Sequence, residues 1–210
     1  MRSTSLVFIL CLAFLACAQK RTEPVDSQKV HFAVDSSLIA ALVTDTVLSI
    51  SFAPPKAWQS LSPKALKSAE HVAMSSLVES PRESLKATPQ LLYAWTHASS
   101  GSVITVSKFP GFDTGDSSIT LREYDEYYRG ASPNTEVKRA VFYSDGFKVH
   151  QLMVTDDQRV TFKMIFSLSR LKSPIQFDFV VPRTSYAQMI KTIESVAGSV
   201  AIHSINKSTN

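Results

Sequence analysis

Few residues of this chain have side chains that could do chemistry, and they are widely spaced. Five histidines lie at positions 31, 71, 97, 150 and 203, and no two of them have the i, i+2 or i, i+4 spacing of a zinc-binding pair. The two cysteines, Cys11 and Cys17, both lie near the N-terminus. The sequence therefore predicts no metal site, and we interpret His97 and His150, which lie on predicted strands, as structural residues.

One acidic triplet and one serine cluster resemble parts of hydrolase sites. Asp113-Thr114-Gly115 has the order found in aspartic proteases, where two such carboxylates share a proton. Only one copy is present, and Asp116 follows where a small residue is usual, so we interpret the triplet as a surface turn. The serines of residues 99–102 lack the elbow and the positioned base that a serine nucleophile needs. We predict no catalytic residue and no cofactor, and hence a protein that is not an enzyme; a hydrolase is the weakest of three functional alternatives.

Cys17 has the clearest chemical role, because it ends an apolar leader. One positive charge, Arg2, precedes an apolar run from Leu6 to Ala16. This run is too short for the ~20 residues of a membrane span and suits a secretory signal peptide. Cleavage after Ala16 leaves an N-terminal cysteine to which lipid can be attached. The sequence predicts a signal peptide at residues 1–16 and a membrane anchor at Cys17.

The leader permits a second cleavage. Ala16 fits a bacterial lipobox, but Phe14 stands where leucine is usual, and residues 16–18 also fit an A-x-A site that leaves Gln19 first. The first alternative predicts a lipid-anchored protein of the bacterial cell envelope, and the second predicts a soluble periplasmic or secreted protein. The polar residues 18–28 favour the anchor, because a lipidated domain needs a flexible tether.

The length of the mature chain predicts one domain, and its charge does not indicate nucleic-acid binding. Without residues 1–16 the chain has 194 residues, and Cys17 is the last cysteine, so no disulfide is expected. The remaining 21 basic and 18 acidic residues give a formal charge of +3, too small and too dispersed for a nucleic-acid surface. We predict a tether and irregular lead-in at 17–43, a single domain at 44–200 and a polar tail at 201–210.

Hydrophobic periodicity predicts helices at the start, the middle and the end of this domain, with strands between them. Predicted helices span residues 63–80, 121–129 and 186–197, and predicted strands span residues 46–52, 91–97, 103–106, 136–143, 147–155, 160–166 and 175–181. Asp145-Gly146 lies between two of the strands and indicates a tight hairpin. Since short connections require antiparallel pairing, the predicted fold class is α+β, with an antiparallel sheet of about six to seven strands sandwiched by helices.

An aromatic group in the middle of the chain is the candidate partner surface. It combines a loop with a short helix, and its residue types are enriched at protein interfaces. The group consists of Phe109, Phe112, Tyr124, Tyr127, Tyr128 and Arg129. The alternative is that some of these aromatic side chains pack inside the fold.

Two packing motifs stand at the ends of the domain: a strand that runs into prolines and a tryptophan, Ile50 to Trp58, and a closing helix from Met189 to Val196. In these motifs and in the order of its elements, the chain resembles the PsbP/DcrB/Mog-like family over residues 44–200. It implies an α/β/α sandwich and a non-enzymatic binding or assembly role, as in extrinsic photosystem subunits and envelope lipoproteins.

Two functional expectations follow from the anchor and the resemblance. The first is an envelope lipoprotein that binds an unknown envelope protein, with a membrane contact through Cys17 and no nucleic acid. The alternative is a carrier or sensor of a small apolar ligand or lipid. That alternative requires a cavity between the sheet and the helices, lined by residues such as Phe162, Met164 and Phe166.

Overall fold

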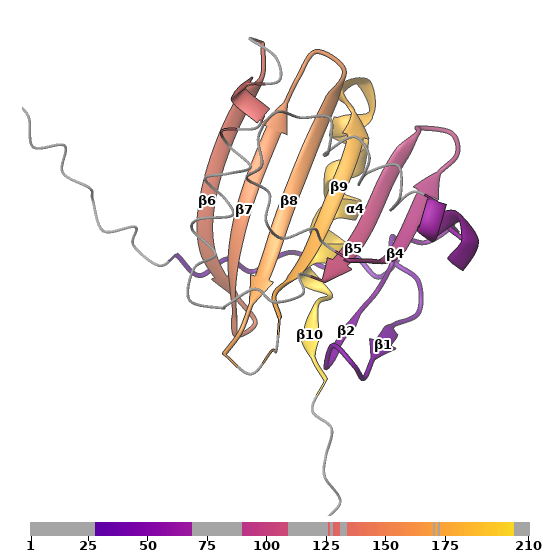
Figure 1. Ribbon diagram of the computed structural model, residues 1–210, viewed down its shortest axis with the longest axis vertical. Coiled ribbons are helices and arrows are strands. Elements are labelled where there is room, and N and C mark those ends of the chain that lie inside the picture. The colour runs from indigo at the N-terminus through magenta and orange to yellow at the C-terminus, as the bar shows by residue number, and fades with distance from the viewer. Residues whose placement is uncertain are drawn as a thin grey trace, which may run out of the picture.

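Two antiparallel sheets and a C-terminal helix form the described part of the protein (Figure 1). The computed structural model describes residues 28–68, 90–108, 126, 128–130, 134–169, 171 and 173–203. Residues 63–68 and 128–130 are also helical. This is an α+β fold, so the predicted fold class is confirmed. No helix within these ranges is long and apolar enough to cross a bilayer.

The larger sheet has seven strands, and neighbouring strands pair antiparallel. Short turns join the consecutive strands β6, β7 and β8, which leaves antiparallel pairing as their only arrangement. In spatial order the strands are β3 (Gln59–Ser60), β4 (Gln90–His97), β5 (Ser102–Lys108), β9 (Ile175–Pro182), β8 (Arg159–Ser167), β7 (Phe147–Thr155) and β6 (Glu136–Ser144).

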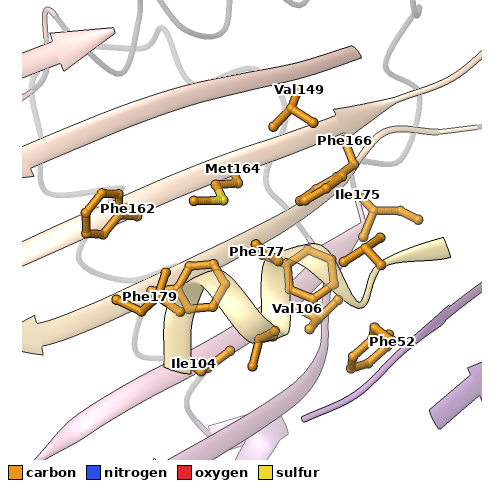
Figure 2. Packing of buried hydrophobic residues seen from close by; sticks show 14 of the residues in the cluster. Phe52, Ile104, Val106, Val149, Phe162, Met164, Phe166, Ile175, Phe177 and Phe179 are labelled. Atoms are coloured by element: carbon orange, nitrogen blue, oxygen red, sulfur yellow. The ribbon is translucent and has the colours of Figure 1, made fainter. Parts of the chain in front are cut away.

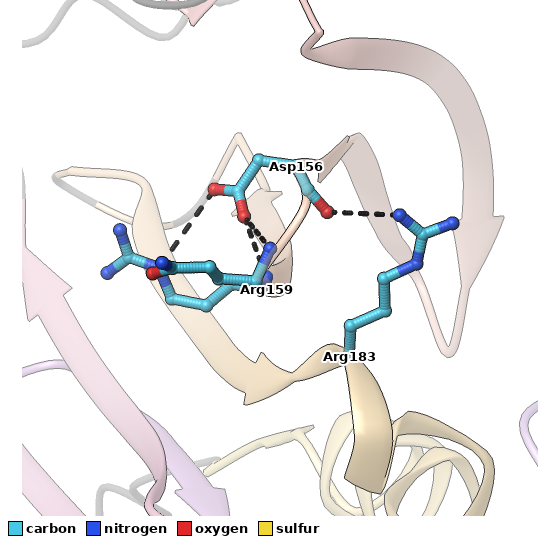
Figure 3. A network of polar contacts seen from close by, with 4 residues as sticks. Asp156, Arg159 and Arg183 are labelled. Carbon is cyan, nitrogen blue, oxygen red and sulfur yellow. Dashed lines mark hydrogen bonds and ion pairs between the residues drawn. The ribbon is translucent and has the colours of Figure 1, made fainter.

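Two tight turns fix the register of β6, β7 and β8. In the first, Asp145 and Gly146 have φ values of 47° and 87°, as both central residues of a type I′ turn require, and the predicted hairpin is confirmed. In the second, Asp156 Oδ1 accepts the backbone N–H groups of Gln158 and Arg159 at 2.8 and 2.7 Å. Figure 3 shows that the carbonyl oxygen of Asp156 also accepts a hydrogen bond from Arg183, at 3.5 Å. The second turn is thereby tied to the end of β9.

The smaller sheet is built from β1 (Val43–Asp45), β2 (Ile50–Phe52) and β10 (Ala201–Ile202), in the order β1-β2-β10. Residues 46–49, expected as the start of a strand, form a turn between β1 and β2. Asp45 Oδ1 explains this turn, because it accepts the N–H groups of Val47 and Leu48 at 2.9 Å each. Strand β10 begins the segment predicted as a polar tail, and it pairs with β2.

Helix α4 (Tyr186–Gly198) follows the short helix η2 (Arg183–Ser185) and covers one face of the larger sheet, behind it in Figure 1. Its buried residues Ile193, Val196 and Ala197 share one side of the helix, because they are three and four positions apart. The helix predicted for this part of the chain is confirmed.

The aromatic core lies between the larger sheet, α4 and β2 (Figure 2). The ligand-carrier alternative places three side chains around a cavity. Their exposed fractions are 5% for Phe162, 3% for Met164 and 1% for Phe166. Phe166 contacts the ring of Phe177 edge-to-face at 5.3 Å, and Phe162 stacks on Tyr186 at 6.0 Å. Among the described residues these three side chains are therefore part of the packed core, which weakens the proposed ligand site on this face.

The lead-in segment, residues 28–42, packs against the domain. Its start pairs with the edge strand β6, since Tyr143 N–H donates to Gln28 O at 3.0 Å and Val30 N–H donates to Tyr143 O at 2.9 Å. Farther along, Asp35 N–H donates to Ser195 Oγ at 3.0 Å, and Ser195 is fully buried in α4. The lead-in segment is thus held at both β6 and the closing helix.

Gly198 ends α4 where the lead-in segment passes closest to it. A Cβ at this position would lie 2.7 Å from Phe32 Cβ and 2.8 Å from Val34 Cγ2. These atoms are close to the backbone of the lead-in segment, so relief requires that segment to move. We expect Gly198→Ala to lower the free energy of unfolding by about 1–3 kcal/mol, measured by urea denaturation. Ala197→Gly, at the neighbouring position in the helix, is the comparison: it costs about 1 kcal/mol of helix propensity plus the contacts of one buried methyl group, and it brings no atom closer to the lead-in segment. Equal stability of Gly198→Ala and the parent would contradict the prediction.

Tyr93 joins the two sheets through one hydrogen bond. Its hydroxyl donates to Asp45 Oδ2 at 2.8 Å, and burial together with this bond raises the pKa of Tyr93 to about 12. We expect Tyr93→Phe to reduce the free energy of unfolding by about 1–2 kcal/mol, because the partly buried carboxylate loses its donor. The free energy of unfolding is measured by denaturant titration for Tyr93→Phe and for the control Tyr143→Phe, which changes a more exposed tyrosine. Equal losses in the two variants would show that the Asp45 bond contributes nothing.

Candidate functional site

The structure describes two of the residues that the sequence predicts as functional. Cys17, Phe109, Phe112, Tyr124 and Tyr127 lie outside the described residues. Tyr128 and Arg129 are described, and both are helical. These two residues are the described part of the predicted partner surface.

Tyr128 lies on the side of the larger sheet opposite α4, because it is next to Lys163, which alternates along β8 with Phe162 on the α4 side, and Arg129 lies at the β6 edge. The Tyr128 ring is half-buried, and its centroid is 6.0 Å from Lys163 Nζ on β8. Arg129 is exposed, and its Nη2 donates to the carbonyl oxygen of Val137 on β6 at 3.1 Å. Tyr128 thus faces a charged group of the sheet, and Arg129 is anchored at the sheet edge.

This face of the sheet carries a buried polar group that the sequence did not reveal. Direct cross-strand partners point to the same face, so the register places Gln176, Ile165 and His150 in one row across β9, β8 and β7. Asp178 and Lys163 form the adjacent row. Gln176, His150 and Lys163 are 1%, 4% and 9% exposed. Polar side chains therefore surround the fully buried Ile165.

The centre of the group is an ion pair. Lys163 Nζ lies 3.0 Å from Asp178 Oδ2, and the two side chains are 11% and 16% exposed. Gln176 Nε2 donates to the same oxygen at 2.7 Å. Asp178 Oδ1 is buried, and it has no hydrogen-bond partner within the described part of the chain. Buried polar atoms of this kind are uncommon, and they mark the group as a candidate site.

His150 is held neutral in this environment. Burial is the main cause, and the nearby Lys148 charge adds to it, so that the pKa of His150 falls to about 4. A neutral imidazole suits a position between the apolar residues Ile165 and Val141, which are its partners on β8 and β6. The group thus holds one charged pair beside one neutral histidine.

This arrangement is better suited to recognition or to structural specificity than to proton transfer. A lysine acts as a base only when it is neutral, and a carboxylate at 3.0 Å stabilises the ammonium form of Lys163. Asp178 Oδ2 already accepts two hydrogen bonds, from Lys163 and Gln176. No group of three or more His, Cys, Asp or Glu side chains in the described ranges is arranged to hold a metal ion.

A second polar cluster lies at the β4–β5 turn. His97 Nδ1 is 2.7 Å from Ser100 Oγ, so the turn does place a base beside a serine, contrary to the interpretation of the sequence. However, Ser100 Oγ donates to Ser102 Oγ at 2.8 Å and accepts from Ser102 N–H at 3.2 Å. The His97 ring also stacks on Trp58, with centroids 5.3 Å apart. The hydroxyl is occupied within its own turn, and His97 has hydroxyl rather than carboxylate neighbours in the described hydrogen bonds.

The two histidines on strands do not meet. Strands β5, β9 and β8 separate β4, which carries His97, from β7, which carries His150. Four strand spacings of about 4.8 Å place them ~19 Å apart. Each histidine is explained by its own local packing.

Exposed apolar side chains gather around β1, the edge strand of the smaller sheet. Val47 is 82% exposed and Leu42 is 64% exposed, the two highest values among the described exposed large hydrophobic residues. Leu42 immediately precedes β1, and Val47 lies in the turn that follows it. An edge strand between exposed apolar residues can accept an extended segment of another protein.

Comparisons with known proteins show no family for this chain. No family model matches the chain, and no curated protein matches it. Among solved structures, the chain is similar to LpqN, a protein involved in cell envelope biogenesis of Mycobacterium tuberculosis. The TM-score is 0.45 at 11% identity, over 78% of this chain and 91% of LpqN. A Bacteroides thetaiotaomicron VPI-5482 protein gives a TM-score of 0.36 at 9% identity, over 78% of this chain and 48% of that protein. The resemblance to the PsbP/DcrB/Mog-like family stays a prediction.

Proposed function

We propose that the protein is an exported, non-enzymatic lipoprotein, anchored through Cys17, whose α+β domain binds a protein of the bacterial envelope. The observation that carries the proposal is the exposed apolar pair Leu42 and Val47 on either side of the edge strand β1. When a partner covers large apolar side chains that are this exposed, their removal from water lowers the free energy and stabilises the complex.

The chemistry of the polar groups supports a binding role. Lys163 is paired with Asp178 at 3.0 Å, and the Ser100 hydroxyl is bonded within its turn. Neither group presents a free nucleophile next to an oriented base, which a hydrolase needs. The apolar leader and the polar residues 18–28 support export and a tether.

Co-purification from detergent-solubilised membranes tests the partner. A tagged parent protein is compared with Leu42→Asp/Val47→Asp and with Thr184→Asp/Gln188→Asp, which adds the same two charges at other exposed positions. We expect one protein to co-purify with the parent and the control, and its recovery to fall roughly tenfold with the first variant. Recovery of the bait alone, or equal recovery with all three proteins, would contradict the proposal.

The intact mass of the mature protein tests the anchor. An acylated chain that begins at Cys17 is the expected result. An unmodified chain that begins at Gln19 would make the protein soluble, and the anchor would then be wrong whatever the partner test shows.

A further inference from the structure

We propose that the domain faces the membrane with one end of its larger sheet, and that Lys29, Tyr143 and Lys148 contact anionic lipid headgroups there. This inference rests on the proposed anchor at Cys17 and adds the orientation of the anchored domain. We call these three residues the basic row.

The basic row is fixed by backbone pairing. Lys29 and Tyr143 form a parallel bridge, and Tyr143 and Lys148 are direct partners across β6 and β7. Side chains paired in this way lie next to each other and point to the same face of a sheet. All three residues are exposed, and Tyr143 is 39% exposed. An aromatic ring therefore lies between two lysines at the surface.

Among the described residues, the charge in and around the row is predominantly positive. Arg139 is exposed and lies four residues before Tyr143 on β6, hence on the same face. Asp145, in the turn after β6, is an acidic residue beside the row. Tyrosine prefers the membrane interface, and each lysine near an anionic surface strengthens binding.

The tether joins the domain next to the basic row, and an anchored tether would therefore hold the row near the membrane. Figure 1 shows the start of the described chain beside β6. There Gln28 bonds to Tyr143, so the tether enters at the basic row itself. Residues 18–27 separate Gln28 from Cys17, and this stretch spans at most about 40 Å when fully extended. An anchor at Cys17 thus holds the basic row within reach of the lipid headgroups.

Lysine labelling of the acylated protein tests this orientation. The full mature protein, with its lipid established by intact mass, is reconstituted into vesicles of phosphatidylcholine alone or mixed with phosphatidylglycerol. An amine-acetylating reagent then reports on each lysine. We expect labelling of Lys29 and Lys148 to slow roughly tenfold in the anionic vesicles, while the exposed Lys56 and Lys191 are unchanged.

Two variants sharpen the test through the lysine that remains. Lys29→Gln is expected to restore labelling of Lys148 in anionic vesicles, whereas the matched Lys56→Gln leaves its protection intact. Asp145→Asn removes the acidic charge from a turn position with φ of 47°, which asparagine tolerates, and is expected to increase protection.

Equal labelling of Lys29 and Lys148 in both vesicle types would overturn the inference. So would protection spread over all four lysines. Because the lipid is established beforehand, either result would leave the anchor standing and reject only the orientation.

Discussion

Lys163→Met is expected to lower the free energy of unfolding by about 3–5 kcal/mol, because it leaves the Asp178 carboxylate buried without its counter-charge. The pair is 3.0 Å apart with side chains only 11% and 16% exposed, so water cannot replace the ammonium group at little cost. Gln176 continues to donate to Asp178 Oδ2, but a neutral amide compensates only part of a full charge. The measurement is urea denaturation at neutral pH.

The chain contains a matched control for this variant. Lys138 and Glu136 form an ion pair at the same 3.0 Å, with side chains 64% and 61% exposed. Lys138→Met is expected to cost less than about 1 kcal/mol, since exposed pairs are screened by water and salt. The two variants remove the same group at the same N–O distance, so burial, together with the contact of Lys163 with the Tyr128 ring, accounts for the difference between them.

A double variant separates the charge from the packing. Lys163→Met/Asp178→Asn removes both charges and keeps an acceptor for Gln176, and we expect it to recover most of the loss. If Lys163→Met costs no more than Lys138→Met, the ion pair does not stabilise the sheet. If the double variant is as unstable as the single one, the loss comes from packing and the electrostatic explanation is wrong.

Alternating hydrophobicity was sufficient to predict the four consecutive strands β6 to β9. β6, β7, β8 and β9 all follow it, and Asp145-Gly146 supplied the turn that joins the first two. The pattern failed where both faces of a strand are buried. Residues Phe162 to Ser167 of β8 are all buried. From the alternation alone Lys163 would be expected to face solvent, although in the fold it is buried and paired.

Contacts between distant segments could not be predicted. Ser195 is a polar residue in an apolar helix, and only the fold shows that it accepts the Asp35 N–H from a segment 160 residues earlier. The pairing of β10 with β2 is of the same kind. A signal for the polar group was present in β9, where Gln176 and Asp178 interrupt an apolar run opposite Lys163, but its meaning depends on the register.

His150 predicts a pH dependence of stability that begins near neutrality. Its pKa is about 4 in the folded protein and 6.5 in the unfolded chain. Between these values the unfolded chain binds a proton that the folded protein does not, so stability is fully present above pH 6.5 and falls as the pH is lowered toward 4. The shift corresponds to a loss of about 3 kcal/mol across this window.

Urea denaturation at several pH values between neutral and mildly acidic measures this loss, with His150→Leu as the test variant. Leucine cannot be protonated and fits between Ile165 and Val141, so we expect its stability to stay nearly level over the window. Lys148→Gln should flatten the curve only slightly, because burial is the larger cause of the low pKa and the Lys148 charge is the smaller. If His150→Leu loses stability as steeply as the parent, other groups carry the acid response. If Lys148→Gln alone levels the curve, the charge of Lys148 outweighs burial.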